Sequence, residues 1–504
     1  MTKIQNNVKT LTHFIGGEMT EGKSGRTSNI YSPSFGEIIG LCPLASTEEV
    51  NEAVEAAHAA FKKWKRISVG KRVQIIHRFR SLLVEKTDQL AEMIGLESGK
   101  TIADAKGEIG RGIESVDLAL NAPHLLKGEY SVNVGGEINS FSMKQPLGVV
   151  AAISPFNFPA MVPLAMTSMA IAVGNAVILK PSEKVPNSAL FLSELWKEAG
   201  LPDGVWTVIN GDKEAVDAIL HNPKIHAISF VGSTKVAEYV YHEGTRHNKR
   251  VASFGGGKNH MVIMPDANID QAVTAFLGAA YGAASQRCMA ISVAMPVGEK
   301  TAEAFVAKLK EKVQELKVGS YNDENADFGA VITQESKDTV IKYIDESLEE
   351  GAHLCIDGRH TQSEKGFYLG PTFLDHVTPD MKIYQEEVFG PARIAVRVNT
   401  LDEAINLINE HEYGNGVTIF TNNGPAARKF TEEIEVGMVG VNVPIPIPVG
   451  YHNFGGLKRS KFGDGHMFGP DTARFFTKTK TISERWPEAK DIGLKTEFSF
   501  PSNQ

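Results

Sequence analysis

Short apolar runs alternate with amphipathic stretches through the middle of the chain, and this alternation constrains the fold more than any other feature. Each run has the length of a strand, and the stretch that follows has the apolar periodicity of a helix. Strands and helices in alternation form a parallel sheet with helices on both faces. We therefore predict an α/β fold, with strands at 149–153, 176–179, 206–209, 225–231 and 261–264 and helices at 159–173, 188–199 and 235–242.

Two further parts of the sequence flank this region. The chain has 504 residues, more than one compact core normally holds at roughly 150 residues per domain. Before the alternating region, Ser46-Thr47-Glu48-Glu49 forms a capping-box signature, and helices are expected at 50–64 and 71–95. After it, a second α/β stretch is predicted over 266–398, with amphipathic helices at 301–316 and 336–350.

Residues 128–147 differ in character from the rest of the chain. Apolar residues such as Tyr130, Val132 and Val134 alternate there with polar or small ones around Gly135-Gly136, which predicts a β-hairpin arm. Residues 475–482 alternate again. We expect this second stretch to pair with the hairpin, either in a partner subunit or at a domain edge.

Charge and cysteine usage exclude several function classes. The net charge of −8 is spread along the chain, so nucleic acid is not an expected partner. The apolar stretch 161–173 is too short for the roughly 18 to 20 residues that span a bilayer, so no membrane partner is expected. The first ten residues show no targeting pattern, and the three cysteines have no metal-type spacing. We expect free thiols, no metal site and a cytoplasmic location.

Cys288 is the first candidate for chemistry. By itself a lone cysteine is more often a small buried hydrophobic residue. However, Arg287 places a cation next to the sulfur in sequence, and a Gly- and Ala-rich approach leads into an expected helix. Such surroundings can stabilise a thiolate and leave it accessible, so Cys288 is a candidate nucleophile.

The segment Ile153-Ser154-Pro155-Phe156-Asn157-Phe158-Pro159 closes the first strand of the predicted sheet. Its prolines favour extended backbone, and the carboxyl edge of an open α/β sheet is where ligands bind. The amide of Asn157 can therefore line an oxyanion hole. A structural asparagine in a turn is the alternative interpretation.

Two later strand ends have residues suited to a dinucleotide. Lys180 and Glu183 follow the second strand, where a nucleotide fold holds the adenosine ribose, and a carboxylate there favours NAD over NADP. A solvated pair in a loop is equally compatible. Gly232 and Ser233 stand between a strand and a helix, where backbone amides can bind a pyrophosphate. The usual G-x-G-x-x-G fingerprint is absent.

Glu387 and Phe389 precede a Gly-Pro turn. The acid can bind a ribose while the ring packs on a nicotinamide, although many acidic segments before a turn look similar. By itself this segment therefore has low specificity.

Together and in this order, these segments resemble the aldehyde dehydrogenase superfamily over almost the whole chain. The resemblance implies a Rossmann-type NAD domain (1–127 and 148–257), an α/β catalytic domain (258–455) and a β arm (128–147 and 470–487) that forms a homodimer or homotetramer. It implies that Cys288 is the nucleophile and Asn157 the oxyanion donor. It also implies cofactor contacts from Ser154, Phe156, Lys180, Glu183, Lys184, Gly232, Ser233, Gly255, Glu387 and Phe389.

Within the superfamily the sequence is most similar to methylmalonate-semialdehyde dehydrogenase, the branch that acylates coenzyme A. The matching features are Phe156 and the segments 257–260, 264–268, 286–289 and 440–446. In that branch two arginines hold the carboxylate of the substrate, and the matching positions are Arg111 and Arg287. A guanidinium fork pairs well with a planar carboxylate. The alternative for Arg111 is a plain surface residue on a helix.

Phe254 indicates how the acyl-enzyme is resolved. Hydrolytic members of the superfamily carry a Glu four residues before the lysine of their Gly-Gly-Lys segment, and Phe254 takes that place here. Loss of a general base costs about 10²–10⁴-fold, so a thiol such as coenzyme A is the expected acceptor. The matched branch usually has Asn at this position, and residues 449–454 also depart from its pattern.

The leading hypothesis is oxidation of malonate semialdehyde or its methyl homologue by NAD and coenzyme A, giving acetyl-CoA or propionyl-CoA and CO2. One alternative is an NAD-dependent dehydrogenase of another small anionic aldehyde, such as a sulfonated or longer semialdehyde. Another is a catalytically silent nucleotide-binding protein.

Overall fold

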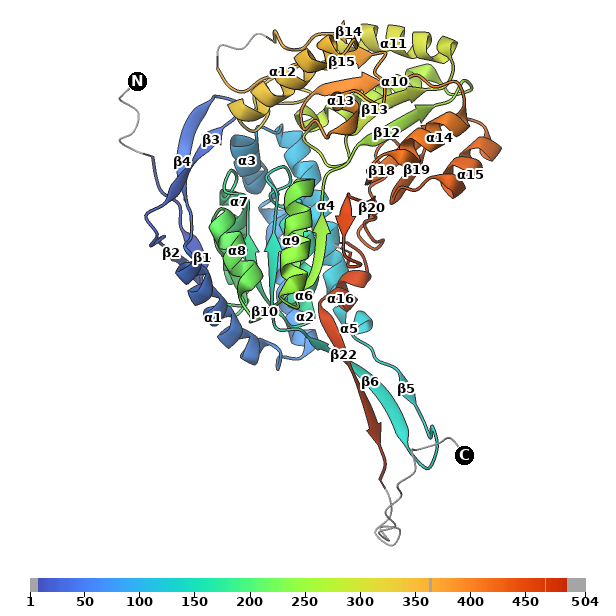
Figure 1. The fold of residues 1–504 in the computed structure, drawn as a ribbon. Coiled ribbons are helices and arrows are strands. Elements are labelled where there is room, and N and C mark those ends of the chain that lie inside the picture. Colours follow the sequence, from blue (N-terminus) through green and yellow to red (C-terminus); the bar gives the residue numbers. More distant parts are fainter. Residues whose placement is uncertain (1–7, 362–364, 467, 487–504) are drawn as a thin grey trace.

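The computed structural model describes residues 8–361, 365–466 and 468–486. It contains two large sheets, each covered by helices, and a thin β arm that projects from the body (Figure 1). The predicted α/β class is therefore confirmed. In the described part of the chain, no helix is long and apolar enough to cross a membrane.

The first sheet has eight strands in the order β2-β1-β9-β8-β7-β10-β11-β21. The five strands from β9 to β11 run parallel, and short antiparallel strands close both edges. The strands are β1 (His13–Ile15), β2 (Glu18–Thr20), β7 (Val149–Ile153), β8 (Ala176–Lys180), β9 (Trp206–Val208), β10 (Ile225–Val231), β11 (Arg250–Phe254) and β21 (Lys461–Phe462).

Alternate residues of β7 show how the two faces of this sheet are buried. Val149, Ala151 and Ile153 pack into one apolar cluster, whereas Val150 and Ala152 pack into another. The first cluster includes α1 (Thr47–Trp64), α8 (Lys213–His221) and α9 (Thr234–Arg246). The second includes α2 (Val69–Glu85), α3 (Thr87–Ser98), α4 (Ile102–Leu120), α5 (Ala122–Leu125), α6 (Met161–Ala172), α7 (Asn187–Glu198) and α16 (Asp471–Phe475).

The strand order reverses between β7 and β10. The chain moves outward from β7 through β8 to β9, then returns to add β10 on the other side of β7. Ile153 and Phe230 are paired in register near the carboxyl ends of these two strands. A reversal of this kind leaves a crevice at the carboxyl edge, which is where ligands of open α/β sheets bind.

The second sheet has seven strands in the order β14-β15-β16-β13-β12-β18-β19. Except for the antiparallel edge strand β14, the strands run parallel. They are β12 (Asn259–Ile263), β13 (Ile291–Pro296), β14 (His353–Ile356), β15 (Thr372–Asp375), β16 (Ala392–Ala395), β18 (Gly416–Phe420) and β19 (Met438–Val441).

Helices bury both faces of this second sheet as well. One face packs with α10 (Ile269–Tyr281) and α11 (Glu299–Val313). The other packs with α12 (Gln334–Glu349), α13 (Lys382–Gln385), α14 (Leu401–Glu410) and α15 (Gly424–Glu433).

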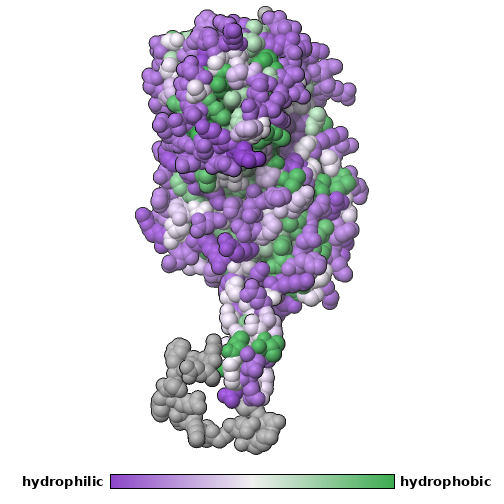
Figure 2. All heavy atoms as spheres, turned by 90° about the vertical axis from the view of Figure 1, so that its right-hand side faces the viewer, coloured by the Kyte–Doolittle hydropathy of each residue, from purple (hydrophilic) through white to green (hydrophobic). Residues whose placement is uncertain are grey.

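The arm is a three-stranded antiparallel sheet of β5 (Tyr130–Ser131), β6 (Asn139–Pro146) and β22 (Thr477–Glu484). β22 pairs with β6 along its full length, from Thr477 opposite Pro146 to Glu484 opposite Asn139. Figure 2 shows this arm standing clear of the body. The predicted hairpin and its pairing with the C-terminal stretch are confirmed, and the pairing lies within one chain. Two further ladders join β3 (Thr27–Ser32) to β4 (Glu37–Pro43) and β17 (Tyr413–Gly414) to β20 (Leu457–Lys458).

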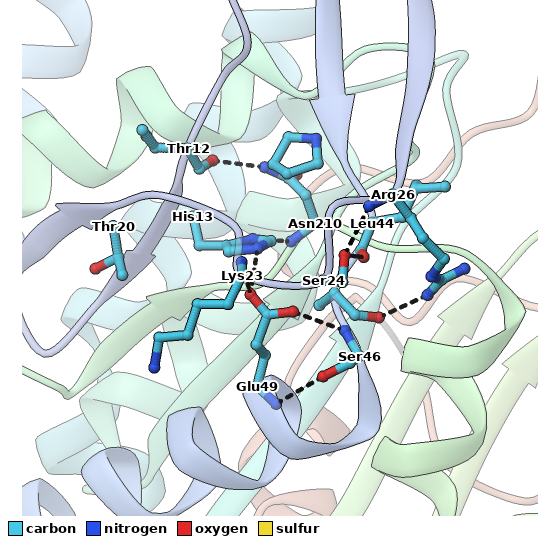
Figure 3. Close-up of polar contacts among 12 residues, drawn as sticks. Thr12, His13, Thr20, Lys23, Ser24, Arg26, Leu44, Ser46, Glu49 and Asn210 are labelled. Atoms are coloured by element: carbon cyan, nitrogen blue, oxygen red, sulfur yellow. Dashed lines mark hydrogen bonds and ion pairs between the residues drawn. The ribbon is translucent and has the colours of Figure 1, made fainter.

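Polar contacts tie the N-terminal segment to the start of α1 (Figure 3). Ser46 and Glu49 form the predicted capping box, in which each side chain accepts from the backbone N–H of the other. Glu49 also accepts from the backbone N–H of Lys23 at 2.6 Å. Asn210, just beyond β9, donates its backbone N–H to His13 Nδ1 at 3.1 Å. These bonds fix the segment and α1 against the first sheet.

Outside the loop that carries Cys288, three details of the fold differ from the prediction. The helix expected at 71–95 is two helices, α2 and α3, which meet at Lys86, because Lys86 leaves the helical conformation with a φ of −99° and a ψ of 16°. The run 261–264 belongs to the second sheet, since the chain leaves the first sheet at Gly255-Gly256-Gly257. Strand β11 was not predicted, because Arg250 and Ser253 interrupt its apolar pattern.

Candidate active site

A cavity of about 820 Å³ opens at the carboxyl edge of the first sheet. Its walls come from the segments after β7, β8, β10 and β11, from α8 and α9, and from two segments of the second α/β region. Of the predicted site residues, the cavity is lined by Ser154, Phe156, Asn157, Lys180, Glu183, Gly232, Ser233, Gly255, Cys288, Glu387 and Phe389. A single space therefore collects residues that are far apart in sequence.

Cys288 lies on the loop between η2 (Gly282–Ser285) and β13. A strand follows the cysteine, so the predicted helix at this point was wrong. Three successive non-glycine residues before it, Ala283, Ala284 and Ser285, have φ values of 54°, 51° and 63°. Left-handed backbone of this kind costs about 1–3 kcal/mol per residue and persists only where the surroundings impose it.

Two asparagines hold the loop that carries the thiol. The Nδ2 atoms of Asn259 and Asn415 each donate to the backbone carbonyl of Cys288, at 2.9 Å in both cases. Asn259 is the first residue of β12 and Asn415 directly precedes β18. The amino edge of the second sheet therefore fixes Cys288 opposite the carboxyl edge of the first.

The Cys288 thiol is neutral in this environment. Burial and, to a smaller extent, the charge of Glu387 raise the pKa of Cys288 to about 12, whereas Lys100 acts in the opposite direction. Arg287 does not supply the cation that the sequence predicted. Its Nη2 pairs with Asp104 at 2.6 Å, and its guanidinium lies against Gly282.

Asn157 joins the two halves of the site. Its side chain is 6% exposed, and Nδ2 donates to the backbone carbonyl of Gln286 at 3.1 Å. An amide nitrogen has two hydrogens, so one remains to meet an oxygen of a reacting group. Gln286 is two residues before Cys288, and its own Nε2 is buried with no hydrogen-bond partner in the described part of the chain.

The end of β8 carries the predicted ribose-binding pair. Lys180 Nζ and Glu183 Oε2 are 3.3 Å apart, and both residues line the cavity. Lys184 does not line it. Its ammonium lies 5.4 Å from the ring centre of Phe156, on the outer side of this segment.

The turn from β10 into α9 leaves polar groups open to the cavity. Ser233 is the N-cap residue of α9, yet its side chain makes no capping hydrogen bond. Ser154 Oγ, across the crevice, is buried and has no partner among the described residues. Gly255 is held by a backbone bond to Ser460, and a Cβ added there would lie 2.9 Å from the carbonyl of Arg459.

Glu387 is buried beside the glycine segment after β11. Its Oε1 accepts from the backbone N–H of Gly257 at 3.1 Å. A Cβ on Gly256 would come within 2.3 Å of Oε2, so glycine is required for this approach. Burial raises the pKa of Glu387 to about 7. Phe389 follows and packs edge-on against Phe156, with ring centres 5.8 Å apart.

The two arginines predicted to bind a substrate carboxylate lie outside the residues that line the cavity. Arg111, on α4, pairs with Glu114 at 2.8 Å and donates to the backbone carbonyl of Pro448. Arg287 pairs with Asp104, which is also on α4, seven positions before Arg111. Both guanidinium groups therefore already have a carboxylate partner.

Phe254 ends β11 and is 4% exposed. Its ring packs edge-on against Phe454 at 6.0 Å, and Lys461 Nζ lies 5.9 Å from its centre. Phe254 belongs to the same apolar cluster as Met289, and Cys288 packs against that cluster. The side of the thiol that meets this cluster is therefore apolar.

The sequence did not single out a buried ion pair behind the site. Lys100 and Glu108 are 2.5 Å apart, with exposed fractions of 4% and 0%. Glu108 also accepts from the backbone N–H groups of Ala160 and Met161 at the start of α6. The i, i+8 spacing of two charged residues gives no signal in sequence, because such pairs are common on helix surfaces.

A family model described as the aldehyde dehydrogenase family matches residues 19–482. A malonate-semialdehyde dehydrogenase of Pseudomonas aeruginosa is 53% identical over 98% of this chain and 99% of its own length. One of the same name from Bacillus subtilis is 42% identical over 95% and 98%.

Solved structures agree with these sequence relatives. One from Sinorhizobium meliloti, named for methylmalonate-semialdehyde dehydrogenase and complexed with NAD, has a TM-score of 0.95 at 50% identity, covering 97% of this chain and 100% of that one. A methylmalonate-semialdehyde dehydrogenase from Oceanimonas doudoroffii has a TM-score of 0.94 at 50% identity, covering 96% and 99%. Because the family model spans most of the sequence and these relatives span nearly all of it, the chain belongs to the aldehyde dehydrogenase family.

Proposed function

We propose that this chain oxidises malonate semialdehyde or methylmalonate semialdehyde with NAD and coenzyme A, and releases acetyl-CoA or propionyl-CoA and CO2. The observation that carries the proposal is the single cavity in which Cys288, Asn157 and Glu387 meet the ends of β7, β8 and β10. The relative at 53% identity, named as a malonate-semialdehyde dehydrogenase, supports the choice of substrate.

In this proposal the first large sheet belongs to the domain that binds NAD, and the second belongs to the domain that carries Cys288. Residues 1–127 and 148–257 form the NAD-binding domain, and residues 258–455 form the catalytic domain that carries Cys288. Residues 128–147 and 470–487 form the arm. Residues 1–7, 362–364 and 487 of these ranges lie outside the described residues.

The residues of the cavity fit NAD. Lys180 can donate to the adenosine ribose and Glu183 can accept from it, while the free hydroxyl of Ser233 and the unpartnered Ser154 Oγ suit a pyrophosphate and its surroundings. Gly232, Gly255, Glu387, Phe156 and Phe389 also line the cavity, and Lys184 contacts Phe156 from outside it. When bound, NAD accepts a hydride from the substrate carbon.

The chemical steps belong to residues of this chain. Cys288 Sγ adds to the aldehyde carbon, and its proton passes to solvent water as the carbon–sulfur bond forms. The oxygen of the aldehyde gains negative charge, and the second N–H of Asn157 is free to donate to it. Loss of hydride from the same carbon then leaves a thioester on Cys288.

The thioester on Cys288 is transferred to an acceptor other than water. Phe254 is apolar and packed against Phe454, so it cannot deprotonate a water molecule. A thiol with a reference pKa of about 8.5 is already a few per cent thiolate at neutral pH. Coenzyme A therefore resolves the acyl-enzyme. The β-carboxylate leaves as CO2 because the thioester carbonyl can take up its electron pair, and the α-carbon then takes a proton from water.

The negative end of the substrate needs a cation at the mouth of the site. Arg111 and Arg287 take this role in the proposal, and each would exchange its present partner, Glu114 or Asp104, for the carboxylate of the substrate. Because any anion that binds there has to displace these two internal ion pairs, the pairs also leave room for a second candidate substrate. An anion of different shape, such as a sulfonated or longer semialdehyde, would compete for the same guanidinium groups.

The arm is proposed to join subunits into a homodimer or homotetramer. Tyr130 and Val132 on or beside β5 are 58% and 75% exposed. A thin sheet that projects from the body cannot bury such residues against its own chain (Figure 2). Light scattering coupled to size exclusion should therefore give a mass above one chain, and deletion of residues 130–144 should reduce it.

One assay tests the proposed function. Purified protein with NAD receives malonate semialdehyde, methylmalonate semialdehyde, a sulfonated aldehyde or propanal, each with and without coenzyme A. NADH formation and the acyl product are followed. The proposal expects rapid NADH formation only with the two β-carboxylate substrates and coenzyme A. Preference for the sulfonated aldehyde would favour the second candidate, and no NADH with any aldehyde would indicate a silent nucleotide-binding protein.

A further inference from the structure

Three potential metal ligands converge on the surface between α8 and α9. His221 Nε2 lies 3.0 Å from Glu243 Oε1, and His247 Nε2 lies 3.2 Å from the same oxygen. All three ligand atoms are within 4.8 Å of one another. In Figure 1 the two helices lie side by side on the same face of the first sheet.

We propose that His221, Glu243 and His247 form a binding site for a divalent transition metal ion, with zinc as the best fit. Two imidazoles and one carboxylate are a ligand set that zinc commonly takes, with water in the fourth position. Imidazole also selects transition metals over magnesium or calcium.

The spacing of the ligands suits a small ion. Ligands at about 2.0–2.1 Å from a tetrahedral zinc lie roughly 3.3–3.4 Å from each other. The two histidine-to-glutamate distances, 3.0 and 3.2 Å, are already close to that edge length. Only the two imidazoles need to approach each other, and their rings are 4.7 Å apart at the centres. The histidine side chains are 49% and 39% exposed, so a small rotation is not blocked by packing.

The surroundings prepare Glu243 for this role. Arg246 binds the other carboxylate oxygen, Oε2, at 3.0 Å and leaves Oε1 to the histidines. A second contact that fixes a ligating carboxylate is typical of metal sites.

The helix ends favour a cation at the same place. His221 is the last residue of α8, and His247 is the C-cap residue of α9. The carboxyl end of a helix carries partial negative charge, which attracts a cation. Glu243 and His247 are four positions apart on α9 and therefore project from one face.

A metal here would tie together two helices that also reach the cofactor cavity. Lys213 and Val216 of α8 and Lys235 and Tyr239 of α9 line that cavity. Asp217 accepts from Tyr239 Oη at 2.8 Å and already joins the helices there. The metal site would hold them at their opposite, carboxyl ends.

The test measures metal binding and does not depend on catalysis. The full-length protein is stripped with a chelator and titrated with Zn²⁺ by calorimetry, alongside the variants His221→Gln, His247→Gln and Glu243→Gln. His360→Gln is the matched control, because His360 is also an exposed histidine near a carboxylate, Asp357. We expect the wild type and the control to bind at one site that each cluster variant weakens by ~10-fold or more.

A second readout is the visible spectrum with Co²⁺. The wild type and the control should show the intense bands of tetrahedral cobalt, and the cluster variants should lose them. Thermal unfolding should shift upward on addition of Zn²⁺ in the wild type and the control only. Equal Zn²⁺ affinity in the wild type and the cluster variants, or no binding by the wild type, would overturn the proposal.

Discussion

Asn157 donates a hydrogen bond from Nδ2 to the backbone carbonyl of Gln286 at 3.1 Å. Asn157 lies on the segment that follows β7 of the first sheet, and Gln286 lies on the loop that carries Cys288 and leads into β13 of the second sheet. This bond places a side-chain donor close to the thiol, with its second hydrogen unused. The hydrogen bond between Asn157 and Gln286 therefore sets where the oxyanion can be bound, next to Cys288.

Replacement of Asn157 by Ala should lower kcat by about 10²–10³-fold, because one donor to the developing oxyanion is lost. Steady-state NADH formation with malonate semialdehyde and coenzyme A measures this. The rate of Cys288 alkylation by iodoacetamide should change much less. Asn325→Ala, on an exposed turn, is the matched control. An unchanged kcat in Asn157→Ala would remove the proposed role.

Glu387 should oppose ionisation of Cys288 in the enzyme without cofactor. Its pKa is raised to about 7, so it becomes an anion as the pH rises through that value, and its charge then raises the pKa of Cys288. Glu387→Gln removes this charge. Alkylation by iodoacetamide should therefore be faster in the variant, by about 2- to 10-fold at pH 8. The ratio of the variant's alkylation rate to that of the wild type should increase between pH 6 and pH 8, because wild-type Glu387 gains its charge over that range.

A control distinguishes this effect from a general change of charge. Glu183 lines the same cavity but pairs with Lys180, and Glu183→Gln should leave the alkylation rate unchanged. If the ratio of the alkylation rate of Glu387→Gln to that of the wild type stays constant with pH, the Glu387 carboxylate and the Cys288 thiol do not interact.

Glu183 should set the preference for NAD over NADP. Its carboxylate is 3.3 Å from Lys180 Nζ and would repel a 2′-phosphate. In Glu183→Gln, Lys180 becomes available to that phosphate, and a charge-assisted hydrogen bond of about 1.5–3 kcal/mol corresponds to roughly 10-fold or more. The KM for NADP should fall by that factor while the KM for NAD rises.

The control for this change is a pair with the same spacing on the surface. Lys312 and Glu315 are also three positions apart and 2.9 Å from each other. Glu315→Gln should alter neither KM. If Glu183→Gln keeps the NAD preference of the wild type, another residue selects the cofactor.

Asp104 should compete with the substrate for Arg287. The pair is 2.6 Å apart, so an anionic substrate has to displace it. Arg287→Ala should raise the KM for malonate semialdehyde about 10- to 100-fold, and Asp104→Asn should lower it. The KM for neutral propanal should change little in either variant. Equal effects on both aldehydes would contradict recognition of the carboxylate by Arg287.

The parts of the fold that sequence could predict are those with a strong local pattern. The run Val149–Ile153, the helix cap at Ser46 and the hairpin around Gly135 all follow from short-range periodicity or turn chemistry. The segment ends that line the cavity could be named because strand ends share one edge of a parallel sheet.

Long-range partners could not be predicted in this way. Asp104 and Arg287, which form an ion pair, are 183 positions apart in the sequence. Asn415, which donates to the backbone carbonyl of Cys288, lies 127 positions after that residue. Nothing in the local sequence links such residues. The left-handed backbone at Ala283, Ala284 and Ser285 could not be predicted from the sequence either, because alanine rarely adopts this conformation without tertiary constraint.

The central claim is that a thioester on Cys288 forms with NAD and is released by coenzyme A. The most direct measurement mixes the enzyme with NAD and malonate semialdehyde but no coenzyme A, and follows NADH and the mass of the peptide that contains Cys288. We expect a burst of NADH equal to the enzyme concentration, an acyl adduct on that peptide, and turnover faster by about 10²-fold or more once coenzyme A is added. Continuous NADH formation without coenzyme A, or any burst from Cys288→Ala, would contradict the account.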